Sequence, residues 1–250
     1  MIYQADTEKK VLAIIQARMG STRLPGKVLL PVNGKSVIER VIARVAKARL
    51  ITQTIVATSD RESDQAIASL CQKLGIVCFR GSENNVLQRF FMAAGEQKAN
   101  TIVRITADCP LLDTRLIDEV IETHFKHGND YTANDAGKTY PRGMDVEVLS
   151  YAALAKAYNQ ATLPKEKEHV TYHIYNNLRE FKVEIVPAPN NLARPNYRLC
   201  VDEEKDLALV REIYQHFSPG EHFSLEEIIA YLDDQPELTR INQNVQQKRV

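Results

Sequence analysis

The sequence predicts an α/β protein with a mostly parallel sheet and helices on both faces. Short runs rich in β-branched residues alternate with longer amphipathic segments, which is typical of strands joined by crossover helices. The chain has 250 residues, enough for one α/β domain with a sizeable core. No internal repeat or low-complexity tract stands out. We therefore expect a single domain over residues 1–250.

Strand and helix signals alternate regularly through the first half of the chain. The strand runs are short and β-branched, and the helix runs place apolar residues at helical spacing. Asp60 is a suitable N-cap for the second helix. We expect strands at 11–17, 54–58, 76–79 and 101–106, and helices at 36–49, 60–74, 86–98 and 114–127.

After residues 130–133 the rhythm changes. Residues 134–143, NDAGKTYPRG, are turn-rich, and the runs that start at Val146, Ala152, Glu166 and Phe181 are irregularly spaced. We interpret the segment 134–190 as an insertion over one end of the sheet. The earlier pattern then returns, with a strand at 197–201, helices at 203–217 and 223–232, and a polar tail from Gln235.

The charge balance, the cysteine spacing and the lack of long apolar runs indicate which ligands and which cellular location to expect. Lys plus Arg and Asp plus Glu each total 32, so the chain lacks the basic field expected of a general nucleic-acid binder. The four cysteines form no C-x-x-C pair and match no zinc or disulfide spacing, which favours a reducing compartment. The polar N-terminus and the absence of a long apolar run predict a cytoplasmic protein that acts on a small molecule, with no membrane contact.

The stretch 16–30, QARMGSTRLPGKVLL, resembles a phosphate-binding loop but matches no standard motif. Five residues separate Gly20 from Gly26, and Val28 follows Lys27 where a P-loop has Ser or Thr. The three glycines of a dinucleotide fingerprint are also absent. The loop nevertheless carries three cations directly after the first strand, which suits an oligophosphate; they are Arg18, Arg23 and Lys27. The alternative is that the glycines only form turns and the cations are solvated.

Two carboxylates also follow predicted strands. Asp108 comes after the strand that ends at Thr106, and Asp202 comes after the strand that ends at Val201. In an open α/β sheet the ligand lies beyond the carboxyl ends of the strands, so both side chains should meet the cationic loop. Together they would form a site for magnesium and phosphate. Taken singly, Asp108 could be a turn residue and Asp202 a helix N-cap.

His169 and His173 have the i, i+4 spacing of metal ligands on one helix. A metalloprotease helix would place Glu after the first His, where this chain has Val170. A pocket-lining or packing role is therefore favoured over a zinc site. No Ser or Cys lies in a recognisable nucleophile elbow.

The loop 17–27, ARMGSTRLPGK, resembles the signature of the sugar cytidylyltransferases that act on 3-deoxy-manno-octulosonate and acylneuraminate. The spore coat polysaccharide branch is similar in further motifs, TADCPL from Thr106, YPRGMDVEV from Tyr140, EHVT from Glu168 and the pair Val201–Asp202. The resemblance covers the chain from about Val11 onward. It implies a Rossmann-like nucleotidyltransferase fold with a small inserted dimerisation subdomain, and transfer of CMP from CTP to an acidic sugar with release of pyrophosphate.

The resemblance also implies roles for individual residues. Arg18 and Lys27 would be catalytic contacts to the phosphates, and Asp108 and Asp202 would bind Mg²⁺. The implied nucleotide-binding residues are Ala17, Arg18, Gly20, Ser21, Arg23, Lys27 and Asp108. Where the octulosonate enzymes have an acidic residue after the first aspartate and Gln-Gly before it, this chain has Cys109 and Thr106-Ala107.

The inserted segment is expected to bind the acceptor and to pair two subunits. For an acidic sugar, Arg142 is the candidate partner of the carboxylate, with His169 beside it, because Arg binds carboxylates bidentately. Glu147 and Glu168 are candidates for the sugar hydroxyls. The alternative is that Arg142 is a solvated turn residue and Glu168 a first-turn helix carboxylate. By resemblance, a homodimer would form through residues 135–186. Its interface candidates, all of which could equally be core, are Tyr151, Leu154, Tyr158, Leu163, Tyr172, Ile174 and Tyr175.

Two other functions fit the same fold class. A metal-dependent glycosyltransferase would need an Asp-x-Asp pair after a strand, whereas the Asp233–Asp234 pair occurs late, in a predicted surface helix. A non-catalytic nucleotide-binding module would not need Arg18, Lys27, Asp108 and Asp202 together. The sequence therefore favours the cytidylyltransferase.

Overall fold

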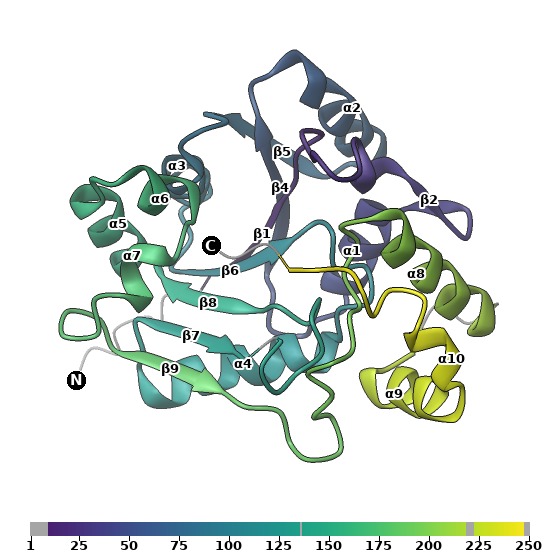
Figure 1. The fold of residues 1–250 in the computed structure, drawn as a ribbon. Helices are drawn as coiled ribbons and strands as arrows, with labels where there is room; N and C mark the ends of the chain where they lie inside the picture. The colour runs from purple at the N-terminus through teal and green to yellow at the C-terminus, as the bar shows by residue number, and fades with distance from the viewer. Residues whose placement is uncertain (1–9, 136, 219–222, 248–250) are drawn as a thin grey trace.

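The computed structural model describes residues 10–135, 137–218 and 223–247 and contains a seven-stranded sheet with helices on both faces (Figure 1). The strand order is β5-β4-β1-β6-β8-β7-β9. Only β8 runs antiparallel to its neighbours in this sheet. The predicted mostly parallel α/β fold is confirmed. The strands are β1 (Val11–Gln16), β4 (Gln53–Ser59), β5 (Val77–Gly81), β6 (Thr101–Thr106), β7 (Tyr131–Asn134), β8 (Glu147–Ser150) and β9 (Val183–Val186).

Several helices begin or end at caps that the sequence supplies. Ser36 and Glu39 form a capping box at the start of α1, and glycines in the left-handed region end α2 and α4. The predicted cap Asp60 was wrong, because a 3-10 turn follows it and α2 begins at Gln65 with Asp64 as its N-cap. The helices are α1 (Val37–Val45), α2 (Gln65–Leu74), α3 (Val86–Glu96), α4 (Thr114–His127), α5 (Tyr151–Gln160), α6 (Pro164–Glu168), α7 (Tyr172–Tyr175), α8 (Glu204–His216), α9 (Leu225–Asp234) and α10 (Pro236–Thr239). Short 3-10 turns, η1 (Lys27–Leu29) and η2 (Glu62–Asp64), and a small hairpin, β2 (Pro31–Val32) with β3 (Lys35–Ser36), complete the described elements.

The sheet separates two apolar cores. In β1, Ala13 and Ile15 face the core formed with α1, α2, α4, α8 and α9, whereas Leu12 and Ile14 face the core formed with α3, α5 and α7. This alternation follows from the two-residue period of a strand. Because both faces of β1 are buried, its carboxyl end is held rigidly at the centre of the sheet.

The strand expected at 197–201 is not present, and this prediction was wrong. Residues there make one isolated parallel bridge, to Arg142. The N–H of Leu199 donates to the carbonyl of Arg142 (2.7 Å) and the N–H of Val201 donates to the carbonyl of Asp108 (2.7 Å). The segment has the composition of a strand, but its backbone pairs with two loops and not with the sheet.

The segment 134–190 is partly sheet. It contributes β8 and β9 as well as α5, α6 and α7, so it extends the sheet in addition to covering its end. Two of the residues predicted for a dimer interface, Leu154 and Ile174, are fully buried in the core. These two residues belong to the core and not to an interface, because α5 and α7 bury them in the cluster that includes α3.

Two further observations concern the cysteines and the polarity of the helices. The four cysteines are free thiols. Within the described ranges, no helix has both the length and the apolar character needed to cross a membrane.

Candidate functional site

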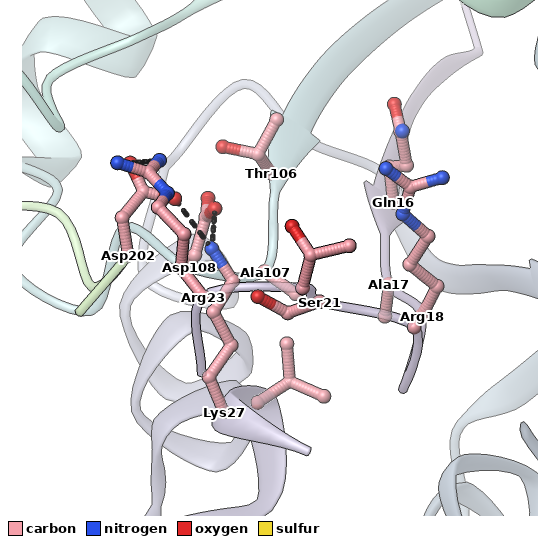
Figure 2. Close-up of a pocket in the computed structure, with 13 residues that line it drawn as sticks. Gln16, Ala17, Arg18, Ser21, Arg23, Lys27, Thr106, Ala107, Asp108 and Asp202 are labelled. Carbon is pink, nitrogen blue, oxygen red and sulfur yellow. Dashed lines mark hydrogen bonds and ion pairs between the residues drawn. The ribbon is translucent and has the colours of Figure 1, made fainter. Parts of the chain in front are cut away.

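A cavity of about 300 Å³ opens beyond the carboxyl ends of β1 and β6 (Figure 2). This volume is at the lower end of the range for small-molecule sites. The cavity is polar and combines cations, hydroxyls and two carboxylates. Its lining residues are Gln16, Ala17, Arg18, Gly20, Ser21, Thr22, Arg23, Lys27, Val28, Thr106, Ala107, Asp108 and Asp202.

One carbonyl group joins the two ends of the phosphate loop, residues 18–27. The carbonyl of Met19 accepts the N–H of Ser21 (2.8 Å) and the N–H of Gly26 (3.1 Å). Gly26 has φ 69°, in the left-handed region that favours glycine, and directly precedes η1. This turn directs Lys27 back into the cavity.

Lys27 lies between the two aspartates. Its ammonium donates to Asp108 Oδ2 at 2.6 Å and to Asp202 Oδ1 at 2.8 Å, as Figure 2 shows. Burial alone would lower the pKa of Lys27, but both carboxylates outweigh it and raise this pKa above its ordinary value. Because one nitrogen touches both side chains, the two aspartates do meet, as the sequence predicts.

Asp202 has two further cationic neighbours. Arg23 contacts it at 2.9 Å and Arg198 forms a second ion pair with it. Burial would raise the pKa of Asp202, but Lys27 and the two arginines lower it to about 2. Asp202 is therefore ionised at neutral pH. It is not a helix N-cap, since Glu203 occupies that position in α8.

The segment that carries Asp202 is fixed by a buried carboxylate. Asp206, with no exposed surface, accepts the N–H of Asp202 (2.9 Å) and the Nε–H of Arg198 (2.9 Å). The chain after α10 also reaches this region (Figure 1), where the carbonyl of Gln246 accepts a hydrogen bond from Arg23 (2.9 Å). Arg23 is thus engaged by protein groups as well as lining the cavity.

The opposite side of the cavity carries Arg18 and Gln16 (Figure 2). Gln16 accepts a hydrogen bond from Arg104 (3.2 Å), which also forms a 2.6 Å ion pair with Glu147. Glu147 in turn accepts the hydroxyl of Tyr131 (3.1 Å). The side-chain oxygen of Gln16 faces Arg104, so the NH₂ group of the Gln16 amide can donate to a ligand.

The structure brings together all eight residues predicted for phosphate, nucleotide and metal. Each of them lines the cavity, namely Ala17, Arg18, Gly20, Ser21, Arg23, Lys27, Asp108 and Asp202. Thr106 and Ala107 also line it, and the thiol of Cys109 donates to Asp108 at 3.6 Å. Gln16 and Arg198 were not predicted. Gln16 falls in the predicted strand 11–17, before the cations of the loop, and no sequence pattern links Arg198 to an aspartate four residues later.

The four predicted acceptor residues lie outside the cavity lining, as far as the described residues define it. Glu147 is linked to the lining through Arg104 and Gln16. Arg142 lies in the turn beside residues 197–201 and approaches Asp145 at 4.0 Å. The other two acceptor residues, Glu168 and His169, are at the end of α6.

His169 and His173 do not share one helical face. The helix α6 ends at Glu168, and His173 belongs to the separate short helix α7. The Nδ1 atom of His173 lies 2.9 Å from Glu166, so this ring packs in a polar contact. Among the described residues, no group of three or more His, Cys, Asp or Glu side chains is arranged to hold a metal by itself.

The Asp233–Asp234 pair is not part of the cavity lining. Asp233, near the end of α9, pairs with Arg194 at 2.7 Å and accepts the hydroxyl of Tyr197. Neither aspartate lines the cavity described above. The pair therefore does not serve as the Asp-x-Asp motif of a glycosyltransferase.

Comparison with known proteins agrees with this geometry. The cytidylyltransferase family model matches residues 12–232. The chain is 40% identical over 239 residues to an uncharacterized protein of Methanocaldococcus jannaschii, covering 96% of this chain and 97% of that one. It is 36% identical over 232 residues to the spore coat polysaccharide biosynthesis protein SpsF of Bacillus subtilis, covering 91% and 95%. A solved cytidylyltransferase structure from Leptospira borgpetersenii has a TM-score of 0.87 and 30% identity, covering 96% of this chain and 99% of that one. With its Rossmann-like nucleotidyltransferase fold and cation-lined cavity, this chain belongs to the cytidylyltransferase family.

Proposed function

We propose that this nucleotidyltransferase transfers CMP from CTP to an acidic sugar and releases pyrophosphate, in the biosynthesis of a surface or spore coat polysaccharide. The observation that carries the proposal is the cavity in which Lys27 lies between Asp108 and Asp202, beside Arg18 and Arg23. This charge arrangement suits a triphosphate with a divalent cation. The similarity to SpsF of Bacillus subtilis supports the polysaccharide pathway.

Asp108 and Asp202 fit a magnesium ion. Both carboxylates reach one point, the ammonium of Lys27, and Asp202 is ionised well below neutral pH. Mg²⁺ commonly takes one or two protein carboxylates and completes its coordination with substrate phosphates and water. Two aspartates are therefore sufficient, and a third protein ligand is not required. When bound, the ion supplies positive charge to the phosphate oxygens.

The transfer needs binding and charge stabilisation more than covalent chemistry. A hydroxyl of the acceptor attacks the α-phosphorus of CTP in line. A new O–P bond forms, the bond to the leaving pyrophosphate breaks, and the hydroxyl proton is released to solvent. Arg18 and Lys27 would offset the charge that develops on the phosphate oxygens. To do so, Lys27 exchanges a carboxylate partner for phosphate. The protein forms no covalent intermediate in this scheme.

The acceptor is proposed to lie on the Gln16 side of the cavity. Arg18 and Gln16 line that side, and Glu147 is connected to it through Arg104. Arg142, Glu168 and His169 remain the proposed partners of the sugar carboxylate and hydroxyls. Because they do not line the cavity, their contribution requires the acceptor to extend beyond it, toward the segment 134–190.

Pyrophosphate release from CTP and Mg²⁺ in the presence of a sugar panel tests the proposal. The panel contains acidic ulosonic sugars, neutral sugars and sugar phosphates, each also assayed with ATP, GTP and UTP. We expect release with CTP plus an acidic sugar only. Release with neutral sugars alone would contradict the acceptor class, and equal release with all four nucleotides would contradict the base preference.

A further inference from the structure

We propose that Asp64 is a positioning residue that holds the phosphate loop in place for the nucleotide. The inference rests on the proposed function in one respect, since it takes residues 18–27 to bind the triphosphate. Asp64 does not line the cavity formed by the described residues, and its surface is only 2% exposed. It therefore acts on the ligand through the loop.

The carboxylate of Asp64 accepts four hydrogen bonds. Its Oδ1 accepts the backbone N–H of Met19 (2.8 Å). Its Oδ2 accepts the hydroxyl of Thr58 (2.9 Å), the N–H of Ser59 (3.1 Å) and the hydroxyl of Ser59 (2.6 Å). Asp64 thus connects the end of β4, a rigid central strand, to the start of the loop.

The backbone of Met19 links Asp64 to both ends of the loop. Its carbonyl accepts the N–H groups of Ser21 and Gly26, and its own N–H is held by Asp64. Ser21 lines the cavity and Gly26 directly precedes Lys27. A shift at Met19 would therefore move residues at both ends of the phosphate site.

A carboxylate suits this position better than an amide does. The backbone N–H groups of Met19 and Ser59 meet opposite oxygens of Asp64, and neither group can reverse its direction. An Asn side chain has only one oxygen, so one of these two N–H groups would face an NH₂ group and lose its acceptor. Burial would raise the pKa of Asp64, but the bonds from Ser59, Met19 and Thr58 lower it, which keeps all four acceptor positions available.

Asp64→Asn is the test, and Asp118→Asn is its matched control. Asp118 is 6% exposed, and its two oxygens accept the backbone N–H groups of Arg49 (3.1 Å) and Leu50 (3.0 Å). It lies on α4 and makes no contribution to the cavity lining. Each substitution leaves one oxygen for two backbone N–H groups, but only for Asp64 does this pair include a residue of the phosphate loop, Met19.

The measurements are the melting temperature, KM for CTP, KM for the acceptor, and binding of inorganic tripolyphosphate by calorimetry. We expect both variants to melt at lower temperature. Asp64→Asn should raise KM for CTP and weaken tripolyphosphate binding by about tenfold or more, because small displacements of binding groups are costly. Every ligand constant in Asp118→Asn should stay within about twofold.

Equal tripolyphosphate affinity in Asp64→Asn and the wild type would overturn the inference, as would no tripolyphosphate binding by the wild type. If the wild type binds tripolyphosphate but does not turn over CTP, the proposed function fails while the role of Asp64 is still tested by that binding. Should Asp64→Asn fail to fold, Ser59→Ala removes one of the bonds to Oδ2. It should then raise KM for CTP in the same direction by a smaller factor, and an unchanged KM would count against the role.

Discussion

At the scale of the residue, Lys27 determines the charge balance of the cavity. It is the cation that contacts both Asp108 and Asp202, and in the proposed reaction it exchanges one of them for a phosphate oxygen. The sequence indicates all three residues, because Lys27 belongs to the cationic loop and each aspartate comes after a predicted strand. It does not indicate Asp64 or Arg198, whose roles depend on contacts that only the folded chain shows.

Replacing Lys27 with Ala should lower kcat/KM for CTP by about a hundredfold or more, the usual effect of removing a well-placed charge contact in the transition state. Steady-state pyrophosphate release measures this. Lys73, on the exposed side of α2, is the control, and Lys73→Ala should behave as the wild type. A Lys27→Ala enzyme within a few-fold of wild type would show that this ammonium does not reach the phosphates.

Asp202 should make the free energy of unfolding depend on pH in the acidic range. Its pKa is about 2 in the folded chain against an ordinary 3.8, so the unfolded chain takes up the proton first as the pH falls. The stabilisation, about 2 kcal/mol, is present above about pH 4 and is lost as the pH falls through the folded-state value. Urea unfolding between about pH 5 and pH 2 should show a shallower loss for Asp202→Asn. Parallel curves for variant and wild type would contradict this.

At the scale of the element, the turn at 141–143 holds the segment that carries Asp202. Gly143 has φ 98°, and a Cβ atom there would lie 2.6 Å from the backbone nitrogen of Cys200. The close approach explains why the motif YPRGMDVEV has glycine at this position. It also explains the error at 197–201, since β-branched and aromatic composition predicts a strand but does not reveal that the partner is a turn. The central strands and most helices were predicted because their apolar periods match buried faces.

Gly143→Ala should destabilise the fold by about 3 kcal/mol or more, since it adds a backbone clash to an unfavourable φ. Gly128→Ala is the matched control, because Gly128 has φ 61° but nothing within 4 Å of the added Cβ. It should cost about 1 kcal/mol. Urea unfolding of both variants gives the comparison. Similar losses in the two variants would mean that strain in φ, and not the approach of Cys200, decides the cost.

At the scale of the whole molecule, the parallel order of β4, β1 and β6 brings their carboxyl ends to one edge. That arrangement is what allows residues near 20, 64 and 108 to act together, and the alternation of strand and helix signals is sufficient to predict it. The position of the segment 134–190 was harder to predict. Its strand β8 pairs with β6 and β7, and its strand β9 pairs with β7. Short irregular runs do not specify such pairings.

Removal of divalent cations should abolish turnover. Treatment with EDTA is expected to stop pyrophosphate release, because the charge of the triphosphate would then be offset by side chains alone. Addition of Mg²⁺ in excess of the chelator should restore the rate, and it should not do so in Asp108→Asn. Full activity in EDTA would contradict the proposed role of both aspartates.

We also expect a homodimer through residues 135–186. Leu163 and Tyr175 are exposed there, at 49% and 36%, and large apolar side chains at the surface favour an interface. Light scattering at micromolar concentration should give twice the mass of the chain. Leu163→Glu should shift the population toward the monomer, whereas the same change at exposed Leu74 on α2 should not. A monomeric wild type would contradict this prediction.

The contact of Lys27 with Asp202 joins residues that are 175 positions apart. During synthesis on the ribosome, Lys27 and Asp108 are both made well before Asp202. A growing chain that ends before Asp202 can pair Lys27 with Asp108 only, and the turn at 141–143 has no segment to hold. Nascent chains arrested before this point should therefore fold much of the sheet without acquiring the complete charge cluster. Catalytic competence would then be gained late in translation, when the segment before α8 folds back against that turn.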